Sequence, residues 1–356
     1  MIVTRRPEEA ASHRANNLGL LRLLFAALVV VAHSPELIDG NRSREILTRV
    51  FGTVSFGEVA VDGFFLISGY LITRSYLGAV SPGAYLARRI LRIYPGFLVA
   101  SLVCVAVVAP LAGGVVTPAA WLKALGRMAL LAPPDVPGAF AGLPYPLLNG
   151  SMWTISYEFG CYLLVLLLGI LGVLRRPRVF LALLAGLCLL YALRGQIPAL
   201  GFSDKAGFRL ASMIRFAAVF CCGGAFYLWR HRIAYSGRGA ALAAALLVPL
   251  LFSAPLAEPA FVVLGGYLVF WFAFAVPPGA ASLAANRLDP SYGLYLYAWP
   301  IQNQLVLYAP GLSPWSVTLI ALGLAGLFGI ASWLVVEEPA MRRGLRPARP
   351  TVNPAP

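Results

Sequence analysis

The feature that most constrains this chain is a series of apolar segments, each about 20 residues long, which is the length a helix needs to cross a bilayer. Of the 356 residues, 60% are hydrophobic and 12% are charged, whereas soluble domains carry about 25% charged residues. The chain is therefore predicted to be all-α, a polytopic integral membrane protein with about ten transmembrane helices. The predicted spans cover residues 16–34, 58–78, 92–112, 153–174, 178–195, 209–229, 239–256, 260–277, 291–309 and 316–336.

Basic residues gather in alternate loops, beginning with the N-terminal segment and ending with the C-terminal tail. By the positive-inside rule these loops face the cytoplasm, so both termini are expected there. The predicted organisation is a cytoplasmic segment at 1–15, a transmembrane domain at 16–343 and a disordered tail at 344–356. The longest outer loop, 113–152, is expected to hold a short amphipathic helix that lies on the outer membrane surface.

The net charge of +14 allows two interpretations, binding to nucleic acid or basic loops against anionic lipid. In a membrane protein the second is favoured, so the bilayer is the expected partner and no nucleic acid is expected. The five cysteines lie mostly within apolar runs and show no metal-ligand spacing. They are interpreted as core thiols, and no metal site is predicted.

Two ionisable residues lie in the first apolar run, Arg22 near its start and His33 near its end. On a helix they stand about 16 Å apart along the axis, roughly half the hydrocarbon thickness. Ionisable groups within a span are costly and usually mark functional sites. His33 is therefore a candidate catalytic residue, with a buried, hydrogen-bonded histidine as the alternative.

With both termini in the cytoplasm, His33, Asp62 and Glu158 are expected at one depth, near the outer ends of their spans. A carboxylate beside an imidazole fixes its tautomer and raises its basicity, so Asp62 or Glu158 is predicted to orient His33 as a general base. The alternative for each carboxylate is a helix cap, because acidic groups are favourable at helix N-termini. Trp153 and Tyr157 are expected at the same depth.

A second cluster, RRILRIYP, runs from Arg88 to Pro95 at the cytoplasmic entry of the third span. Arg88 and Arg92 share one helix face, and guanidinium groups bind phosphate through paired donors. Arg22 and Arg74 are expected on the same side of the membrane. Simple anchoring by the positive-inside effect is the alternative.

Six motifs resemble those of the membrane acyltransferase-3 family, and they follow the order of that family from about residue 16 to 343. They are Arg22 and His33 with ten residues between them; Gly57 with VDGFFLISGY, Val61 to Tyr70; Arg89 with Arg92, Ile93, Tyr94 and Pro95; Trp153 with Thr154 and Glu158; SYGLYLYAWP, Ser291 to Pro300; and Glu338 with Pro339.

This resemblance implies a multi-pass enzyme of the bacterial cytoplasmic (inner) membrane. It would be an O-acyltransferase that moves an acyl group, acetyl in the first instance, from acyl-CoA to a hydroxyl of a cell-envelope or exported glycan, free or lipid-linked. Acetyl-CoA or another acyl-CoA would be the co-substrate, with no permanently bound cofactor.

The resemblance also assigns roles to residues. His33 would be the general base or the acyl carrier, with Asp62 and Glu158 as catalytic partners. The donor would bind Arg22, Arg74, Arg88, Arg89, Arg92 and Tyr94. The substrate-binding candidates are Trp153, Tyr157, Ser68 and Tyr70, and the last three carry hydroxyls suited to an oxyanion.

One position departs from the family pattern, because Ala298 stands where many members have a histidine. Three alternatives stay open at this point. The chain is a transporter or flippase of a glycan or lipid intermediate, an acyltransferase acting on a small secondary metabolite, or a membrane sensor or binding protein without catalytic activity.

Overall fold

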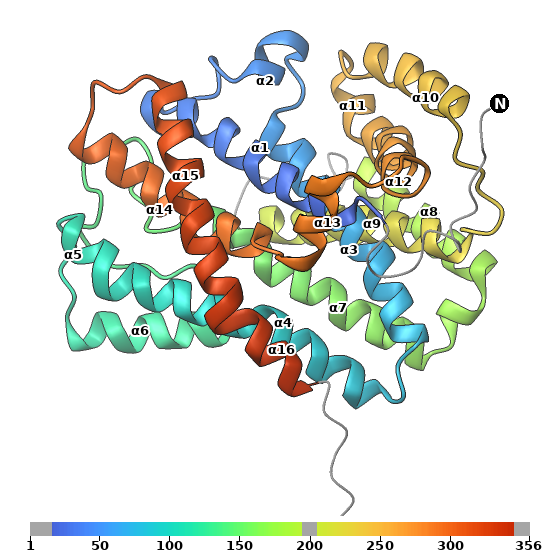
Figure 1. Ribbon diagram of the computed structural model, residues 1–356, viewed down its shortest axis with the longest axis horizontal. Coiled ribbons are helices and arrows are strands. Elements are labelled where there is room, and N and C mark those ends of the chain that lie inside the picture. Colours follow the sequence, from blue (N-terminus) through green and yellow to red (C-terminus); the bar gives the residue numbers. More distant parts are fainter. Residues whose placement is uncertain (1–15, 194–204, 345–356) are drawn as a thin grey trace, which may run out of the picture.

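The computed structural model describes residues 16–193 and 205–344, and within these ranges every regular element is a helix (Figure 1). The first range contains α1 (Leu18–Asp39), α2 (Ile46–Phe51), α3 (Phe56–Leu77), α4 (Pro82–Val103), η1 (Cys104–Val108), α5 (Ala109–Leu111), α6 (Pro118–Ala129), η2 (Ser151–Thr154), α7 (Ile155–Ile170), η3 (Val173–Arg175) and α8 (Pro177–Ala192). The second contains α9 (Lys205–Leu228), α10 (Gly237–Leu250), α11 (Ala254–Ala260), η5 (Phe261–Gly265), α12 (Gly266–Ala275), α13 (Ala280–Arg287), α14 (Ser291–Tyr308), α15 (Pro314–Ser332), η6 (Trp333–Glu337) and α16 (Glu338–Gly344). The predicted segment 1–15 and the tail beyond residue 344 lie outside the described residues.

Seven helical segments of the described chain are long and apolar enough to cross a membrane. They are Leu18–Asp39, Phe56–Leu77, Pro82–Leu111, Ser151–Ile170, Ala206–Leu228, Ala254–Ala275 and Pro314–Arg343. The other three predicted spans coincide with α8 and α10, which are shorter apolar helices, and with α14. The helical, multi-pass membrane fold is thus confirmed, whereas the count of ten spans and the location of the termini stay predictions.

Helices α3 and α9 approach so closely that each needs a glycine at the contact. A Cβ atom on Gly69 would collide with the backbone oxygen of Phe220, and one on Gly223 with that of Leu66. Small residues allow neighbouring helix backbones to meet in this way within membranes. Helix α1 packs against both α3 and α14, which places it at the centre of the molecule (Figure 1).

Hydrogen bonds between buried side chains connect α1 to α14 and α15. The Gln302 amide donates to the Ser34 hydroxyl at 2.7 Å and to the Val30 carbonyl at 2.8 Å, and Thr318 donates to Ser34 at 2.7 Å. Such bonds satisfy polar groups that would otherwise meet hydrocarbon. They fix the position of His33, which directly precedes Ser34.

The short helix predicted in the 113–152 loop is present as α6, and its location at the outer membrane surface stays a prediction. Helix α6 runs back beside α4, and at its end the Ala129 carbonyl accepts a hydrogen bond from Tyr94 at 3.0 Å. Tyr94 lies about 18 Å from the start of α4. The chain then returns, and the Phe140 N–H donates to the Ala112 carbonyl at 2.9 Å. Segment 112–140 therefore forms a hairpin that packs against α4.

The apolar face of α6 explains why this helix packs against α4. Ala120, Ala124 and Met128 recur at intervals of four residues and are buried, so this face packs on protein rather than on lipid. Sequence periodicity identifies an apolar face, but it does not identify what covers that face.

Helix α7 begins inside the protein, not at its surface. The Tyr295 hydroxyl donates to the Ser151 carbonyl at 2.5 Å, and the Asn149 amide donates to the Leu296 carbonyl at 2.7 Å. Tyr295 and Leu296 belong to the first half of α14. The start of α7 is therefore held one to two turns from the beginning of α14, deeper than the predicted span edge.

Candidate active site

A cavity of about 610 Å³ lies among α1, α3, α4, α7, α14 and η6. All five arginines predicted to bind the donor line it, and so do three other predicted site residues. The five arginines are Arg22, Arg74, Arg88, Arg89 and Arg92, and the other three are Ser68, Tyr70 and Glu158. The structure therefore brings together the predicted arginine cluster from three helices; we call this space the arginine cavity.

The walls of the arginine cavity contain buried donors without acceptors. The Nε atoms of Arg22, Arg88 and Arg89 and the indole nitrogen of Trp333 are buried without a hydrogen-bond partner. A buried unsatisfied donor is unfavourable. Only two carboxylates, Glu158 and Asp289, line the cavity beside the five guanidinium groups. The cavity is thus suited to an anion with several acceptor oxygens.

Asp289 joins two of the five arginines at the entrance to α14. Its Oδ2 atom lies 3.1 Å from Arg22 and 2.7 Å from Arg92, and Ser291 donates to Oδ1 at 2.6 Å. Burial raises the pKa of the Asp289 carboxyl, but Arg22 and Arg92 outweigh burial and hold this pKa below its usual value. Arg92 also lies 3.5 Å from Glu337. Arg22 and Arg92 are therefore partly neutralised.

Glu158 lies in the arginine cavity and accepts two hydrogen bonds on one oxygen. The Ser68 hydroxyl donates to its Oε1 atom at 2.8 Å and the Tyr162 hydroxyl donates to the same atom at 2.7 Å. Glu158 forms no ion pair with any described residue. Its second oxygen remains available to a hydrogen-bond donor of a bound molecule.

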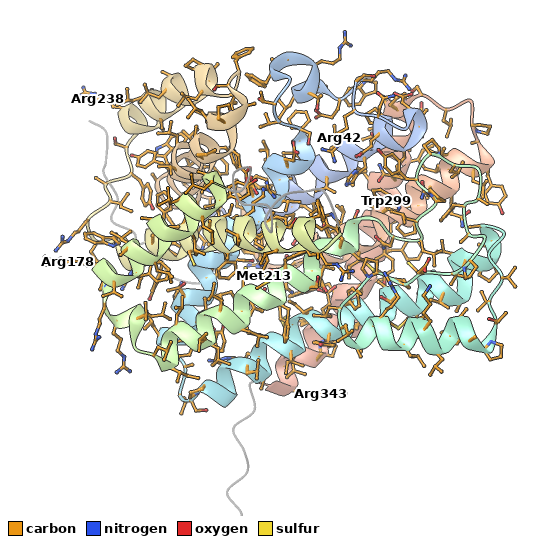
Figure 2. The ribbon with its side chains drawn as sticks, turned by 180° about the vertical axis from the view of Figure 1, so that it is seen from behind. Arg42, Arg178, Met213, Arg238, Trp299 and Arg343 are labelled. Atoms are coloured by element: carbon orange, nitrogen blue, oxygen red, sulfur yellow. The ribbon has the colours of Figure 1, made fainter. Side chains whose placement is uncertain are left out.

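His33 lies at the far end of α1 from Arg22, outside the arginine cavity. Its Nδ1 atom is 2.8 Å from Oε2 of Glu36, and Arg42 donates to Oε1 of Glu36 at 3.1 Å. The indole ring of Trp299 packs edge-on against the imidazole, with 4.8 Å between ring centroids. In Figure 2, Arg42 and Trp299 appear near the upper right, far from Arg343 at the lower edge. We call His33, Glu36 and Arg42 the histidine cluster.

The predicted partners of His33 are therefore wrong, because the adjacent carboxylate is Glu36 rather than Asp62 or Glu158. Glu158 lies elsewhere because α7 begins inside the protein. The prediction also rested on the residues lying at the same depth. Equal depth does not determine the direction in which each side chain points around its helix. The catalytic roles of His33, Asp62 and Glu158 stay predictions.

Asp62 points from α3 toward α9 and joins a separate buried charge cluster. Its carboxylate lies 2.8 Å from a guanidinium nitrogen of Arg215, which also pairs with Glu258 of α11. Only 4% of the Asp62 side chain is exposed. This pairing connects three helices and keeps Asp62 away from the imidazole.

Three other predicted site residues lie outside the arginine cavity. Tyr94 is two positions after Arg92, so it points to the opposite side of α4 and contacts Ala129. Its donor-binding role stays a prediction. Trp153 and Tyr157 pack on each other and on Phe216 of α9. Their substrate-binding role stays a prediction.

Sequence reasoning missed Glu36, Asp289 and Trp333. Glu36 follows His33 by three residues, and side chains three apart are neighbours on a helix, so its position was available as a signal. Asp289 precedes the SYGLY motif by two residues and resembles an ordinary loop carboxylate. Trp333 was hidden within an apolar run, because nothing in such a run distinguishes a cavity wall from a lipid contact.

Comparison with known proteins adds an independent line of information. Residues 16–336 match a family model described as an acyltransferase domain. Nodulation protein 10 of Rhizobium leguminosarum bv. viciae is 27% identical over 367 aligned residues, which cover 94% of this chain and 95% of that protein. An O-acetyl transferase of Shigella phage Sf6 is 29% identical over 156 residues, covering 43% of this chain and 45% of the relative. No solved structure matches the chain.

Proposed function

The chain belongs to the membrane acyltransferase-3 family, and from this premise we propose that it transfers an acyl group from acyl-CoA to a hydroxyl of a cell-envelope or exported glycan. The observation that carries the proposal is the set of five arginines around one cavity with buried, unpartnered donors. The proposed location is the bacterial inner membrane.

The donor binds in the arginine cavity. Coenzyme A carries a diphosphate and a further phosphate, which supply the acceptor oxygens that the buried N–H groups lack. Arg22 and Arg92 are already paired with Asp289, so Arg88 and Arg89 are the first candidates for the phosphates. Arg89 also lies 5.9 Å from the centroids of the Tyr85 and Tyr162 rings, which hold its guanidinium in place.

The pantetheine arm then passes Glu158 on its way inward. The free oxygen of Glu158 accepts a hydrogen bond from an amide N–H or the hydroxyl of this arm, while Ser68 and Tyr162 hold the carboxylate. Glu158 is thus assigned a donor-binding role in place of the predicted contact with His33.

His33 acts at the other end as the general base. Glu36 occupies Nδ1 and fixes the tautomer, which leaves Nε2 to take the proton from the acceptor hydroxyl. The acceptor oxygen attacks the thioester carbonyl, the carbon–sulfur bond breaks and coenzyme A leaves as the thiolate. An acyl-histidine is the other route through the same residue.

The test is transfer of label from radiolabelled acetyl-CoA in membranes that contain the wild type, His33→Ala or His231→Ala at equal protein level. His231 is exposed and serves as the histidine control. We expect label in a glycan or lipid-linked glycan fraction for the wild type and the control, and none for His33→Ala. Equal labelling in all three would remove His33 from the reaction, and no labelling in any would reject acetyl-CoA as donor.

A further inference from the structure

Three aromatic rings from three different helices meet at one end of the arginine cavity. Phe64 of α3 packs edge-on against Phe25 of α1 at 5.9 Å between centroids and against Tyr295 of α14 at 6.1 Å. Phe64 and Tyr295 line the cavity. We call Phe25, Phe64 and Tyr295 the aromatic layer.

The aromatic layer lies between the arginine cavity and the histidine cluster. On α1, Phe25 lies one turn after Arg22 and about 12 Å before His33 along the helix axis. On α14, Tyr295 lies one turn before Trp299, whose ring contacts the His33 imidazole. An acyl group that enters beside the arginines therefore reaches the layer before it reaches His33.

Two of the three rings are held in place. The Tyr295 hydroxyl bonds to the Ser151 carbonyl and to the Thr154 hydroxyl, at 2.5 and 2.7 Å. The Phe25 ring fills the space over Gly63 so closely that a Cβ atom there would collide with it. Phe64 is partly exposed, packs against the hydrophobic core and stands edge-on between the other two rings. Because both neighbours are held, Phe64 has little freedom to turn aside.

We propose that Phe64 is a specificity-determining residue, which limits the transferred acyl group to short chains such as acetyl. The inference rests on the proposed function and adds the class of acyl group to it. A small acyl group fits past the edge of the Phe64 ring toward His33. A longer chain needs the space that the Phe64 ring occupies, because the rings of Phe25 and Tyr295 beside it are held in place.

The experiment compares acetyl-CoA, butyryl-CoA and octanoyl-CoA, each labelled in the acyl group, in membranes containing the full chain. For the wild type we expect octanoyl transfer to be about tenfold or more below acetyl transfer, because hydrophobic sites discriminate chain length by factors of this size. Phe64→Ala should raise the octanoyl-to-acetyl ratio by about tenfold.

Two further variants separate selectivity from loss of folding. Phe64→Leu keeps most of the side-chain volume and should raise the ratio by a smaller factor. Phe328→Ala removes a phenyl ring that is 52% exposed on α15 and should leave the ratio unchanged. Thermal stability in detergent should be recorded for each variant, since a purely structural role of Phe64 would lower stability without changing the ratio.

Three results would overturn the inference. They are equal acetyl and octanoyl transfer by the wild type, an unchanged ratio in both Phe64 variants, or the same rise in Phe328→Ala. Transfer from none of the three donors by the wild type would instead reject the proposed function, and the inference with it. The two failures are therefore distinguishable.

Discussion

The arginine cavity and the histidine cluster lie at opposite ends of α1 and differ in how their charges are balanced. In the cavity, five guanidinium groups face two carboxylates and several donors lack acceptors. In the histidine cluster, Glu36 lies between His33 and Arg42 and both of its oxygens are bound. The cavity therefore retains unused hydrogen-bond donors, whereas both oxygens of the carboxylate in the histidine cluster are already paired.

This contrast indicates a division of labour. Changes in the arginine cavity should affect how tightly the donor binds, and changes in the histidine cluster should affect the rate of the chemical step. The predictions below test that division.

The largest effect is expected at the histidine cluster. His33→Ala should lower kcat by about a thousandfold, because a general base contributes a factor of this order. The KM for acetyl-CoA should change little, since His33 does not line the arginine cavity. The measurement is steady-state transfer over a range of acetyl-CoA concentrations. A large rise in KM with kcat preserved would contradict the division.

The opposite pattern is expected in the arginine cavity. Arg88→Ala should raise the KM for acetyl-CoA by about tenfold or more with little change in kcat, because it removes a charge-assisted hydrogen bond to phosphate. Arg178→Ala is the control, because Arg178 is exposed at the molecular edge (Figure 2). Equal rises in KM in the two variants would show that the effect comes from a general loss of positive charge and not from a specific contact with phosphate.

Glu36→Gln should lower kcat by roughly tenfold, because the neutral amide no longer favours the imidazolium form of His33. Glu158→Gln should act on KM instead, since Glu158 lies in the arginine cavity. Measuring kcat and KM for both variants tests which carboxylate assists His33: Glu36, which contacts the imidazole, or Glu158, which the sequence suggested. If Glu158→Gln lowered kcat and Glu36→Gln did not, the assignment would be reversed.

The smallest effect concerns the stability of the cavity wall. Asp289→Asn should lower the free energy of unfolding by roughly 2 kcal/mol at neutral pH, because it leaves two partly buried arginines without their shared carboxylate. The pKa of Asp289 is held below its ordinary value of 3.8 in the folded protein. Its contribution is therefore fully present above about pH 4 and is lost as the pH falls through the lowered pKa.

The measurement is the melting temperature of both proteins in detergent between pH 7 and pH 3. The difference between wild type and Asp289→Asn should narrow as the pH falls below 4. A difference that stays constant across this range would contradict the ion-pair explanation. A difference that widens toward low pH would do so as well.

The sequence predicted the arginine cavity better than the histidine cluster, for a physical reason. Arg88, Arg89 and Arg92 lie within two turns of one helix, so their spacing alone places them together. Pairing His33 with a carboxylate on another helix required the rotation of that helix and the depth at which it begins. The rotation depends on contacts such as those of Gly69 with Phe220 and of Gly223 with Leu66, and the depth depends on the hydrogen bond between Ser151 and Tyr295.

The fold also has one part that the sequence predicted and one part that it did not. The length of the apolar runs predicted helices at all ten places, because bilayer thickness constrains length directly. The packing of the 112–140 hairpin on α4 was not predicted, because the pattern of α6 is that of an interfacial helix and does not indicate its contact with Tyr94. Periodicity does not predict the position of a helix whose surroundings are other protein segments rather than lipid or water.

The anchoring of α7 on α14 has a consequence for biosynthesis. The Ser151 carbonyl bonds to Tyr295, which lies 144 residues later in the chain, and the Asn149 amide bonds to Leu296, which lies 147 residues later. While the ribosome is still translating the intervening helices, these two hydrogen bonds cannot form. The start of α7 therefore reaches its native position only after α14 has been made. A chain truncated before residue 291 should enter the membrane but remain a substrate for quality-control proteases.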